Sequence, residues 1–553
     1  MELFIIDAIG PFFRDYDKDI INWSKIPFEN LEIDGKLDRD KFRQIKRDFS
    51  IFIEKVSEIG YNAISIDDVA HLIDFNFYPE SLKDKIKQYR KELKELFHIA
   101  RNRGLKIFVN TDIMFYNKGI DDLTKGRDEG ILMLLKEACH RLIDELPIEG
   151  IIFRIGESDG LDVKGDFLSR LTIKTTKQAR EYIKTLLPIF ERKDKYMIFR
   201  TWTVGAYEVG DLIWNKRTYD SIFKDIHSAH LIISMKYGNT DFFRDLELNP
   251  LFFNGKQKKI IELQARRERE GSAINPYYVG WEYEKYARKL KNLENLVGIS
   301  LWCQTGGWAR WRDLTFIHNS SKTNELNTYA SLKIFKENIS ADSAIEEFFG
   351  DSEYIKFYKL YEKIFSELLY VKGFSEKKLF FRRVRVPPLI WTYWDRITVT
   401  NFMIVVHEFY GGKSPDVDYN SMEEILTLGR KLEIEDVLCH YHTLRMLRDC
   451  RRALSGEIFC GDLMQKIEIY KDMYPDRYDF NISASRRGMK FLRFMTEVIF
   501  RIFIREGSDY RSFDRFLISR SLSTFYDFFI KIYSIGLPSF VNKESMTMEV
   551  LFS

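Results

Sequence analysis

Eight short apolar runs, separated by amphipathic segments, dominate the first 300 residues of the chain. The runs are rich in Ile, Val and Phe and show little polar alternation, which is typical of strands buried on both faces of a parallel sheet. The segments between them include helix candidates at residues 40–57 and 82–101. Strand–helix alternation repeated eight times predicts a (β/α)8 TIM barrel. The runs cover residues 3–7, 63–66, 106–110, 150–155, 196–201, 230–235, 259–264 and 297–303.

The strand signal disappears beyond about residue 315. Residues 323–553 have the pattern of amphipathic helices, with a loop expected at 384–389, where two prolines stand together. We therefore predict a catalytic barrel over residues 1–320 and a mainly α-helical C-terminal domain over 321–553, which offers a surface for a homodimer. A doubly wound open sheet is the competing topology, but no GxGxxG follows an early run.

Composition excludes several classes of partner. A net charge of +3 over 553 residues gives no case for binding nucleic acid or a membrane surface. The N-terminal MELFIIDAIG lacks the basic region of a secretory leader, and no apolar run reaches the roughly 20 residues of a membrane span. A cytoplasmic location is expected. The group Cys439, His440, His442 and Cys450 lacks a paired CxxC and lies in a helical pattern, so we expect neither a metal nor another cofactor.

Polar or charged residues follow seven of the eight runs. In a barrel these strand ends share one rim, which is where the chemistry of TIM barrels is found. A single such residue carries little weight, because helix N-caps also favour Asp, Ser and Thr at these positions. The rim set is Asp67, Asp68, Asn110, Thr111, Asp112, Glu157, Asp159, Arg200, Thr201, Trp202, Lys236, Asp241, Glu268, Gln304, Thr305 and Trp308.

Three carboxylates of this rim are placed for cleavage of a glycosidic bond, namely Glu157, Asp241 and Glu268. That reaction needs an acid for the leaving oxygen and a base or nucleophile on the other face of the sugar, and carboxylates serve both roles. Cations stand at or near the ends of the fourth, fifth and sixth runs, at Arg154, Arg200 and Lys236. Such a group of cations would select an anionic sugar, since Arg pairs bidentately with a carboxylate.

Each of these residues also has a purely structural interpretation. Arg and Glu at strand ends often form buried ion pairs. Glu262, inside the seventh run, would point inward or pair with a rim Arg, and we interpret it as structural support for Glu268. The charged run RREREG at residues 266–271 is most simply a solvated loop or the first turn of a helix. Asp67 and Asp68 could hold a divalent cation, but helix capping is favoured. Stacking on a sugar ring competes with core packing for Trp202, Trp302, Trp308 and Trp311.

Several segments, in the same order, resemble the family 67 α-glucuronidases, which remove glucuronic acid or its 4-O-methyl ether from xylo-oligosaccharides with inversion. The resemblance covers roughly residues 1–350 and rests on the ordered set of segments. These segments are IGYNAISIDDVA, RGLKIFVNTD, IIFRIGESDG, IFRTWTVG, SMKYGNTDFF, NPLF, IIELQARREREG, QTGGW and NTYASLKIFKENISADSAIEEF.

The resemblance implies a role for each matching residue. Glu157 is implied to be the general acid, while Asp241 and Glu268 position and deprotonate the attacking water. Basic residues that bind the uronate carboxylate correspond to Arg154, Arg200 and Lys236. Further substrate contacts are expected at Trp202, Trp23, Asp67 and Trp308.

The sequence departs from the family in ways that concern the substrate. The usual N-terminal α/β domain does not precede the first run, Arg154 stands where the family tends to have Lys, and the spacing around Glu157 differs by about one residue. ARRERE is also much more basic than the family pattern. We predict an inverting hydrolase that releases a terminal uronic acid from plant-type oligosaccharides, with Glu157 roughly 6.5–9.5 Å from the Asp241/Glu268 pair. A glycosidase of another specificity and an inactive carbohydrate-binding barrel are the alternatives.

Overall fold

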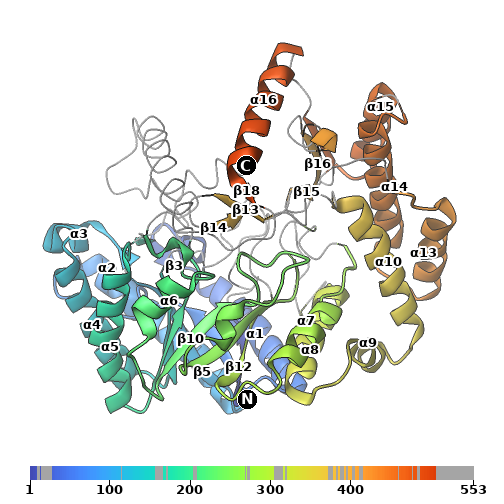
Figure 1. The fold of residues 1–553 in the computed structure, drawn as a ribbon. Coiled ribbons are helices and arrows are strands. Elements are labelled where there is room, and N and C mark those ends of the chain that lie inside the picture. Colours follow the sequence, from blue (N-terminus) through green and yellow to red (C-terminus); the bar gives the residue numbers. More distant parts are fainter. Residues whose placement is uncertain are drawn as a thin grey trace.

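The computed structural model has a closed barrel of eight parallel strands in its N-terminal half (Figure 1). It describes most of residues 1–505; the ranges outside this description are chiefly 9–25 except Phe13, 156–165, 204–207, 268–274 except Glu270, 304–315, 371–377 and 506–553. Neighbouring strands pair in the order β1-β12-β11-β10-β9-β7-β5-β4 before the ring closes. The strands are β1 (Leu3–Asp7), β4 (Ala63–Asp67), β5 (Lys106–Asp112), β7 (Gly150–Arg154), β9 (Tyr196–Arg200), β10 (Leu231–Lys236), β11 (Lys258–Gln264) and β12 (Leu296–Trp302).

The barrel strands form where the sequence predicted them, because their side chains pack against apolar layers on both faces. All six residues of β10 are buried, for example. One apolar cluster fills the barrel interior and includes Phe108, Ile198 and Ile260. A separate and larger cluster lies between the strands and the surrounding helices. The predicted (β/α)8 fold is therefore confirmed.

Two glycines allow the barrel wall to close. A Cβ atom on Gly298 of β12 would lie 1.8 Å from the carbonyl oxygen of Leu3 in β1. A Cβ atom on Gly150 of β7 would lie 2.2 Å from the carbonyl oxygen of Tyr196 in β9. Neither approach is possible for a residue with a side chain, so glycine is required at both positions.

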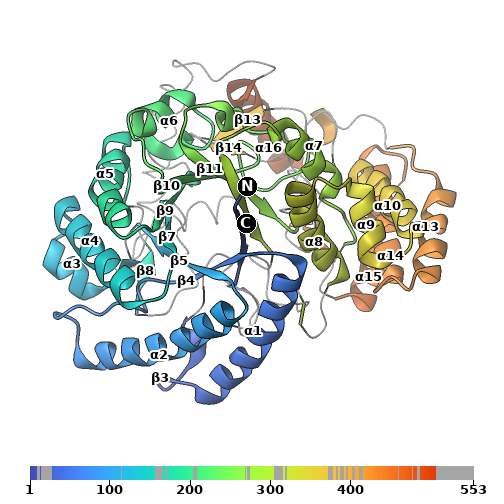
Figure 2. The same cartoon turned by 90° about the horizontal axis from the view of Figure 1, so that it is seen from below.

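Helices surround the barrel on its outer face (Figure 2). The first, α1, begins after Asp38, whose carboxylate accepts from the backbone N–H groups of Asp40 and Lys41, and it ends at Gly60 with a φ of 111°. A capping box formed by Thr175 and Gln178 starts α5. The helices of this part are α1 (Arg39–Ile59), α2 (Glu80–Asn102), α3 (Lys118–Thr124), α4 (Asp128–Glu145), α5 (Thr176–Arg192), α6 (Lys216–Phe223), α7 (Gly280–Leu290) and α8 (Lys322–Glu337).

Short elements decorate the loops of the barrel. Two small antiparallel sheets pair β2 (Glu32–Ile33) with β3 (Lys36–Leu37) and β6 (Phe115–Tyr116) with β8 (Leu168–Ser169). Single turns of 3-10 helix occur at η2 (Phe28–Leu31), η3 (Glu208–Asp211) and η4 (Pro250–Phe253).

The C-terminal region is mainly helical, as predicted, but it also contains strands. Its helices are α9 (Ala341–Phe349), α10 (Glu353–Leu369), α13 (Tyr419–Lys431), α14 (Val437–Leu454), α15 (Cys460–Met473) and α16 (Arg486–Phe503). One three-stranded sheet joins β14 (Val384–Val386), β13 (Lys378–Phe381) and β18 (Ile504–Arg505), and another joins β15 (Thr392–Tyr393), β16 (Arg396–Thr400) and β17 (Tyr478–Asn481). The loop expected at 384–389 is thus wrong over 384–386.

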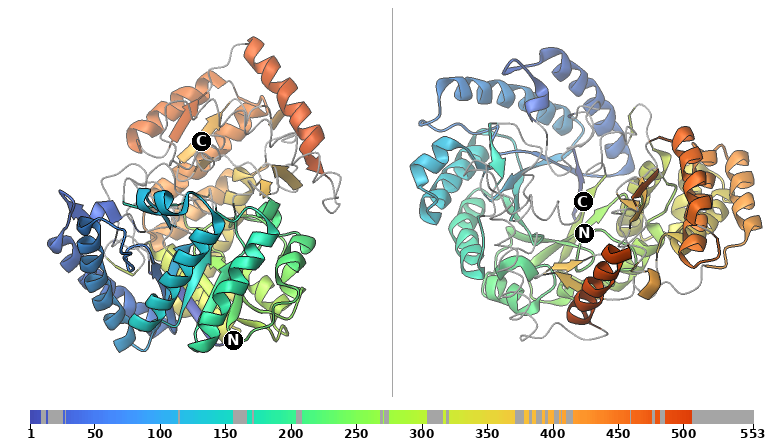
Figure 3. Two further views of the ribbon diagram at one scale, coloured as in Figure 1. Left: turned by 90° about the vertical axis from the view of Figure 1, so that its left-hand side faces the viewer. Right: turned by 90° about the horizontal axis from the view of Figure 1, so that it is seen from above.

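The two three-stranded sheets of the C-terminal region lie on the side of the barrel opposite the N-terminus, which is the side where the barrel strands end (Figures 1 and 3). Helix α9 packs against α7 and α8, and α10, α13 and α14 follow on its outer side (Figure 2). The rim that carries polar side chains therefore faces the C-terminal region. No helix in the described part of the chain is long and apolar enough to cross a membrane.

Candidate active site at the carboxyl rim of the barrel

Arg200, at the end of β9, forms a bidentate ion pair with Glu262 of β11. The Nε and NH2 atoms of Arg200 lie 2.9 Å from the two oxygens of Glu262, and Ser234 of β10 donates to Oε1 over 2.7 Å. Burial alone would raise the pKa of Glu262, but Arg200, Lys236 and the hydroxyl of Ser234 lower it below its usual value. The guanidinium of Arg200 also lies 4.6 Å from the ring centre of Trp302. Glu262 is thus the structural partner of a rim arginine, which is one of the two arrangements expected from the sequence.

Lys236 and Asp241 meet at the end of β10. Lys236 Nζ donates to Asp241 Oδ1 over 2.6 Å, and the backbone N–H of Phe242 donates to the same oxygen over 3.0 Å. The ammonium lies 3.8 Å from the ring centre of Trp202 and 4.6 Å from that of Phe242. The side chain of Asp241 is 18% exposed, whereas that of Lys236 is 4% exposed. No described residue hydrogen-bonds Asp241 Oδ2, so one oxygen is fixed and the other remains available to a ligand.

Arg154, at the end of β7, lies between two carboxylates of neighbouring strands. Its NH2 atom is 3.4 Å from Oδ1 of Asp67 in β4, and its Nε atom is 3.3 Å from Oδ1 of Asp112 in β5. The side chain of Arg154 is 1% exposed and that of Asp67 is fully buried. Asp67 Oδ2 also accepts from the backbone N–H of Ile26 over 3.0 Å. Asp67 therefore acts as a buried bridge between β4, β7 and the segment that precedes η2.

The described residues of the charged run after β11 are buried, which corrects the prediction of a solvated loop for them. Arg266 and Arg267 are each 3% exposed, and Glu270 is fully buried. Arg244, in the loop after β10, donates to both oxygens of Glu270 over 2.8 and 2.7 Å. Tyr370, which follows α10, also donates to Glu270.

The same buried network extends to α10 and α7. Arg267 donates to Glu362 of α10 and to Glu282 of α7, each over 3.2 Å. Glu362 Oε1 also accepts from the backbone N–H of Tyr278 over 2.6 Å. Because partners arrive from several elements, these charges can be buried. The run ties the rim loops of β10 and β11 to the C-terminal region.

The described residues bring together part of the predicted site. The cations Arg154, Arg200 and Lys236 all lie at the rim, each beside a carboxylate, and Trp202 and Asp241 contact Lys236 or lie next to it. Four residues of the predicted site lie outside the described part of the chain, namely Glu157, Glu268, Trp23 and Trp308. The distance from Glu157 to the Asp241/Glu268 pair therefore stays a prediction. Sequence reasoning missed that Glu362 accepts from Arg244 and Arg267 and that Tyr370 donates to Glu270, because these partners are 95 to 118 residues apart along the chain.

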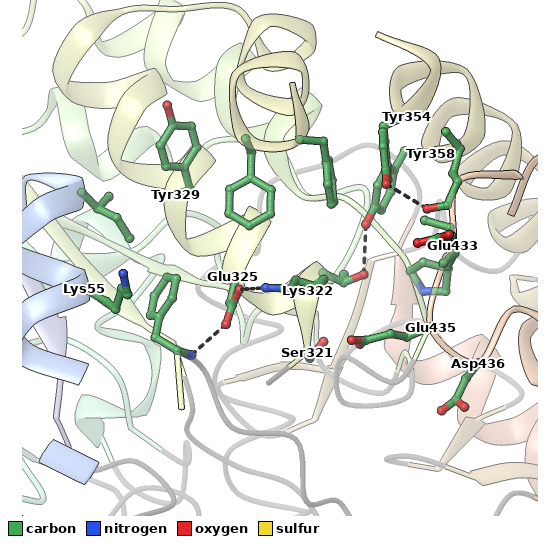
Figure 4. A pocket seen from close by; sticks show the side chains of 18 of the residues that line it. Lys55, Ser321, Lys322, Glu325, Tyr329, Tyr354, Tyr358, Glu433, Glu435 and Asp436 are labelled. Carbon is green, nitrogen blue, oxygen red and sulfur yellow. Dashed lines mark hydrogen bonds and ion pairs between the residues drawn. The ribbon is translucent and has the colours of Figure 1, made fainter. Parts of the chain in front are cut away.

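A separate pocket of about 830 Å³ lies outside the barrel wall (Figure 4). It is formed between the last turns of α1, the length of α8, helix α10 and the connection from α13 to α14. Rings and carboxylates share its lining, including Tyr329, Tyr354, Glu325 and Glu435. Burial raises the pKa of Glu435; Lys322 opposes this, whereas Asp436 and Glu325 add to it. None of the rim residues described above lines this pocket.

No protein-family model matches the sequence, and no curated protein is similar to it at a significant level. Among solved structures, the chain is similar to a GH138 enzyme targeting pectin rhamnogalacturonan II, with 11% identity and a TM-score of 0.48 over 86% of this chain and 60% of that one. A GH89 enzyme from Clostridium perfringens, in complex with its substrate GlcNAc-alpha-1,4-galactose, has 10% identity and a TM-score of 0.47 over 85% of this chain and 54% of that one. The chain spans little more than half the length of these two proteins.

A D-psicose 3-epimerase from Clostridium cellulolyticum H10 is also similar, with 12% identity and a TM-score of 0.33 over 53% of this chain and 94% of that one. At these levels the likeness concerns the fold, since barrels of this type host many chemistries. The function has to be argued from the rim itself.

Proposed function

We propose that the protein is a glycoside hydrolase that releases a terminal uronic acid, such as glucuronic acid, from an oligosaccharide by an inverting acid/base mechanism. The observation that carries the proposal is the arrangement of Asp241, whose Oδ1 is held by Lys236 and by the Phe242 N–H while Oδ2 has no partner among the described residues. A carboxylate fixed on one side and open on the other is suited to orient a water molecule for attack.

The proposed reaction uses three carboxylates in two roles. Asp241 and Glu268 hold the attacking water, and Glu268 takes its proton as the new bond to the anomeric carbon forms. Glu157 gives its proton to the glycosidic oxygen as the bond between that oxygen and the anomeric carbon breaks. The anomer that is released first has the inverted configuration. Every atom comes from the substrate and one water molecule, so the reaction needs no cofactor.

The charge of the rim supports an anionic sugar. Three cations stand at the ends of β7, β9 and β10, and two of them lie against the rings of Trp202 or Trp302. The described ion pair of Lys236 is with the proposed catalytic Asp241. The field of these cations would attract a uronate.

The test is the release of free uronic acid from a panel of aldouronic oligosaccharides, with neutral oligosaccharides of the same linkage run in parallel. NMR of the anomer formed first reports inversion or retention. Asp241→Asn should reduce turnover by a factor of about 10³ or more, because the group that orients water loses its charge. Cleavage of neutral substrates only would refute the specificity, and activity near wild type in Asp241→Asn would refute the mechanism.

A further inference from the structure

Arg266 is a buried cation without a counterpart among the described residues. It stands two positions beyond the end of β11 and is 3% exposed. No described atom accepts a hydrogen bond from its Nε, NH1 or NH2 atom. Every other buried Arg or Lys in the described part of the chain contacts a carboxylate or a backbone carbonyl; these are Arg154, Arg200, Lys236, Arg244, Lys259, Arg267 and Arg451.

Tyr277 is a second buried donor in the segment between β11 and α7. Its side chain is fully buried, and no described atom hydrogen-bonds its hydroxyl group. Burial raises the pKa of Tyr277 and so keeps the hydroxyl protonated, while the charge of Arg266 acts in the opposite direction. The backbone of Tyr277 is held in place, because Asn327 Nδ2 donates to its carbonyl oxygen over 3.2 Å. Tyr277 is thus a second buried donor, on a fixed backbone, in the segment that follows β11.

The position of Arg266 along the chain relates it to the rim. Pairing of β11 with β12 continues past the end of the strand, because the N–H of Ala265 donates to the carbonyl of Trp302 over 2.9 Å. Arg266 is the next residue and stands two positions past the last strand residue, Gln264. Glu262 meets Arg200 and Ser234 within the barrel. Arg266 therefore belongs to the end of the barrel that carries Asp241.

We propose that Arg266, together with the hydroxyl of Tyr277, binds the carboxylate of the uronic acid, an assignment that rests on the proposed function. A buried guanidinium is costly unless an anion pairs with it, and its planar fork matches a carboxylate bidentately. The cations predicted for this role already face carboxylates of the protein. They act as positioning residues for Asp67, Glu262 and Asp241, and recognition of the substrate charge passes to Arg266.

The experiment compares Arg266→Met with Arg267→Met, a matched change of the neighbouring arginine. Activity is measured on a glucuronoside and on the same compound with the carboxylate reduced to the alcohol. Arg266→Met should lower kcat/KM for the glucuronoside about 100-fold, since two charge-assisted hydrogen bonds are lost, and should change it less than about threefold for the reduced compound. Arg266→Lys should recover part of the loss. Tyr277→Phe should show a smaller loss with the same selectivity.

Two further measurements separate binding from folding and from catalysis. Without ligand, Arg266→Met should melt within about 2 °C of the wild type, because an unpaired charge is removed, whereas Arg267→Met should melt much lower because it breaks the buried network. D-glucuronate should raise the Tm of the wild type but not that of Arg266→Met, and D-glucose should affect neither.

The outcomes distinguish this inference from the proposed function. If the wild type hydrolyses no glycoside but D-glucuronate stabilises it through Arg266, the proposed function fails while the anion site stands. If the wild type cleaves glucuronosides and Arg266→Met loses activity equally on both substrates, or melts as low as Arg267→Met, then Arg266 has a structural role and the inference is overturned.

Discussion

The ion pair between Arg200 and Glu262 offers a quantitative test of how the rim is held. Glu262→Gln keeps the shape of the side chain but removes its charge. Arg200 would then stay buried, at 3% exposure, without its carboxylate, and one of its two 2.9 Å bonds would lose its acceptor, because the amide nitrogen of Gln can only donate. Removal of one member of a buried pair costs about 3–5 kcal/mol. We therefore expect the free energy of unfolding of the barrel to fall by about that amount.

The control is Ser234→Ala, which removes only the third hydrogen bond to Glu262, of 2.7 Å. A single hydrogen bond to a charged group contributes about 1.5–3 kcal/mol, so this variant should lose less than Glu262→Gln. Urea denaturation followed by tryptophan fluorescence measures the free energy of unfolding of both variants, provided that their m-values equal that of the wild type. The double variant Arg200→Met with Glu262→Gln should recover part of the loss, because no buried charge is left unpaired.

The same pair predicts the dependence of stability on pH. The pKa of Glu262 is lower in the folded protein than in the unfolded chain, so its contribution is fully present above the unfolded value of about 4.3. The contribution disappears as the pH falls through the folded pKa. Wild type should therefore lose more stability than Glu262→Gln as the pH falls below about 4.3. The reasoning is refuted if Glu262→Gln loses no more stability than Ser234→Ala. It is also refuted if the stability of the wild type and that of Glu262→Gln fall equally as the pH is lowered.

Three further predictions concern the rim and the network behind it. Lys236→Met should lower kcat even at temperatures where the variant is fully folded, because Asp241 loses the cation that orients it at 2.6 Å. Equal kcat values for variant and wild type would contradict this. Trp202→Leu should weaken the hold on Lys236 and reduce kcat less than Lys236→Met does, since a cation–π contact contributes about 0.5–2 kcal/mol. Glu270→Gln should reduce the free energy of unfolding by about 3–5 kcal/mol, because Arg244 and Arg267 lose a fully buried partner; urea denaturation with unchanged stability would show that the network is dispensable.

Much of the barrel could be predicted because its signal is local. Each apolar run of the sequence is a strand whose bounds differ from the predicted ones by no more than two residues, as β5 (Lys106–Asp112) and β12 (Leu296–Trp302) illustrate. Strands buried on both faces need continuous apolar residues, and this requirement is visible without any knowledge of the neighbours. The small C-terminal sheets were missed for the opposite reason. β13 pairs with β18 more than 100 residues later, and Pro387 directly after β14 has the signature of a loop.

The candidate site shows the same division. The types of residue that gather at the rim follow from the sequence, since parallel strands of a barrel end on one side, and pairing with a rim arginine was one of the two arrangements expected for Glu262. The sequence does not show how many charges each of the rim cations faces. Arg154 lies between Asp67 and Asp112, contributed by two different strands.

The sequence by itself determined the barrel, the order of its strands and the presence of carboxylates and cations at their ends, because these depend on periodicity and on the direction of the strands. Only the tertiary structure decided which charges are buried and which are compensated. In the run after β11, Arg267 and Glu270 find partners on α7, α10 and the loop after β10, while Arg266 finds none among the described residues. Three neighbouring charges of one run thus differ in role because burial makes the energy of a charge depend on the atoms around it.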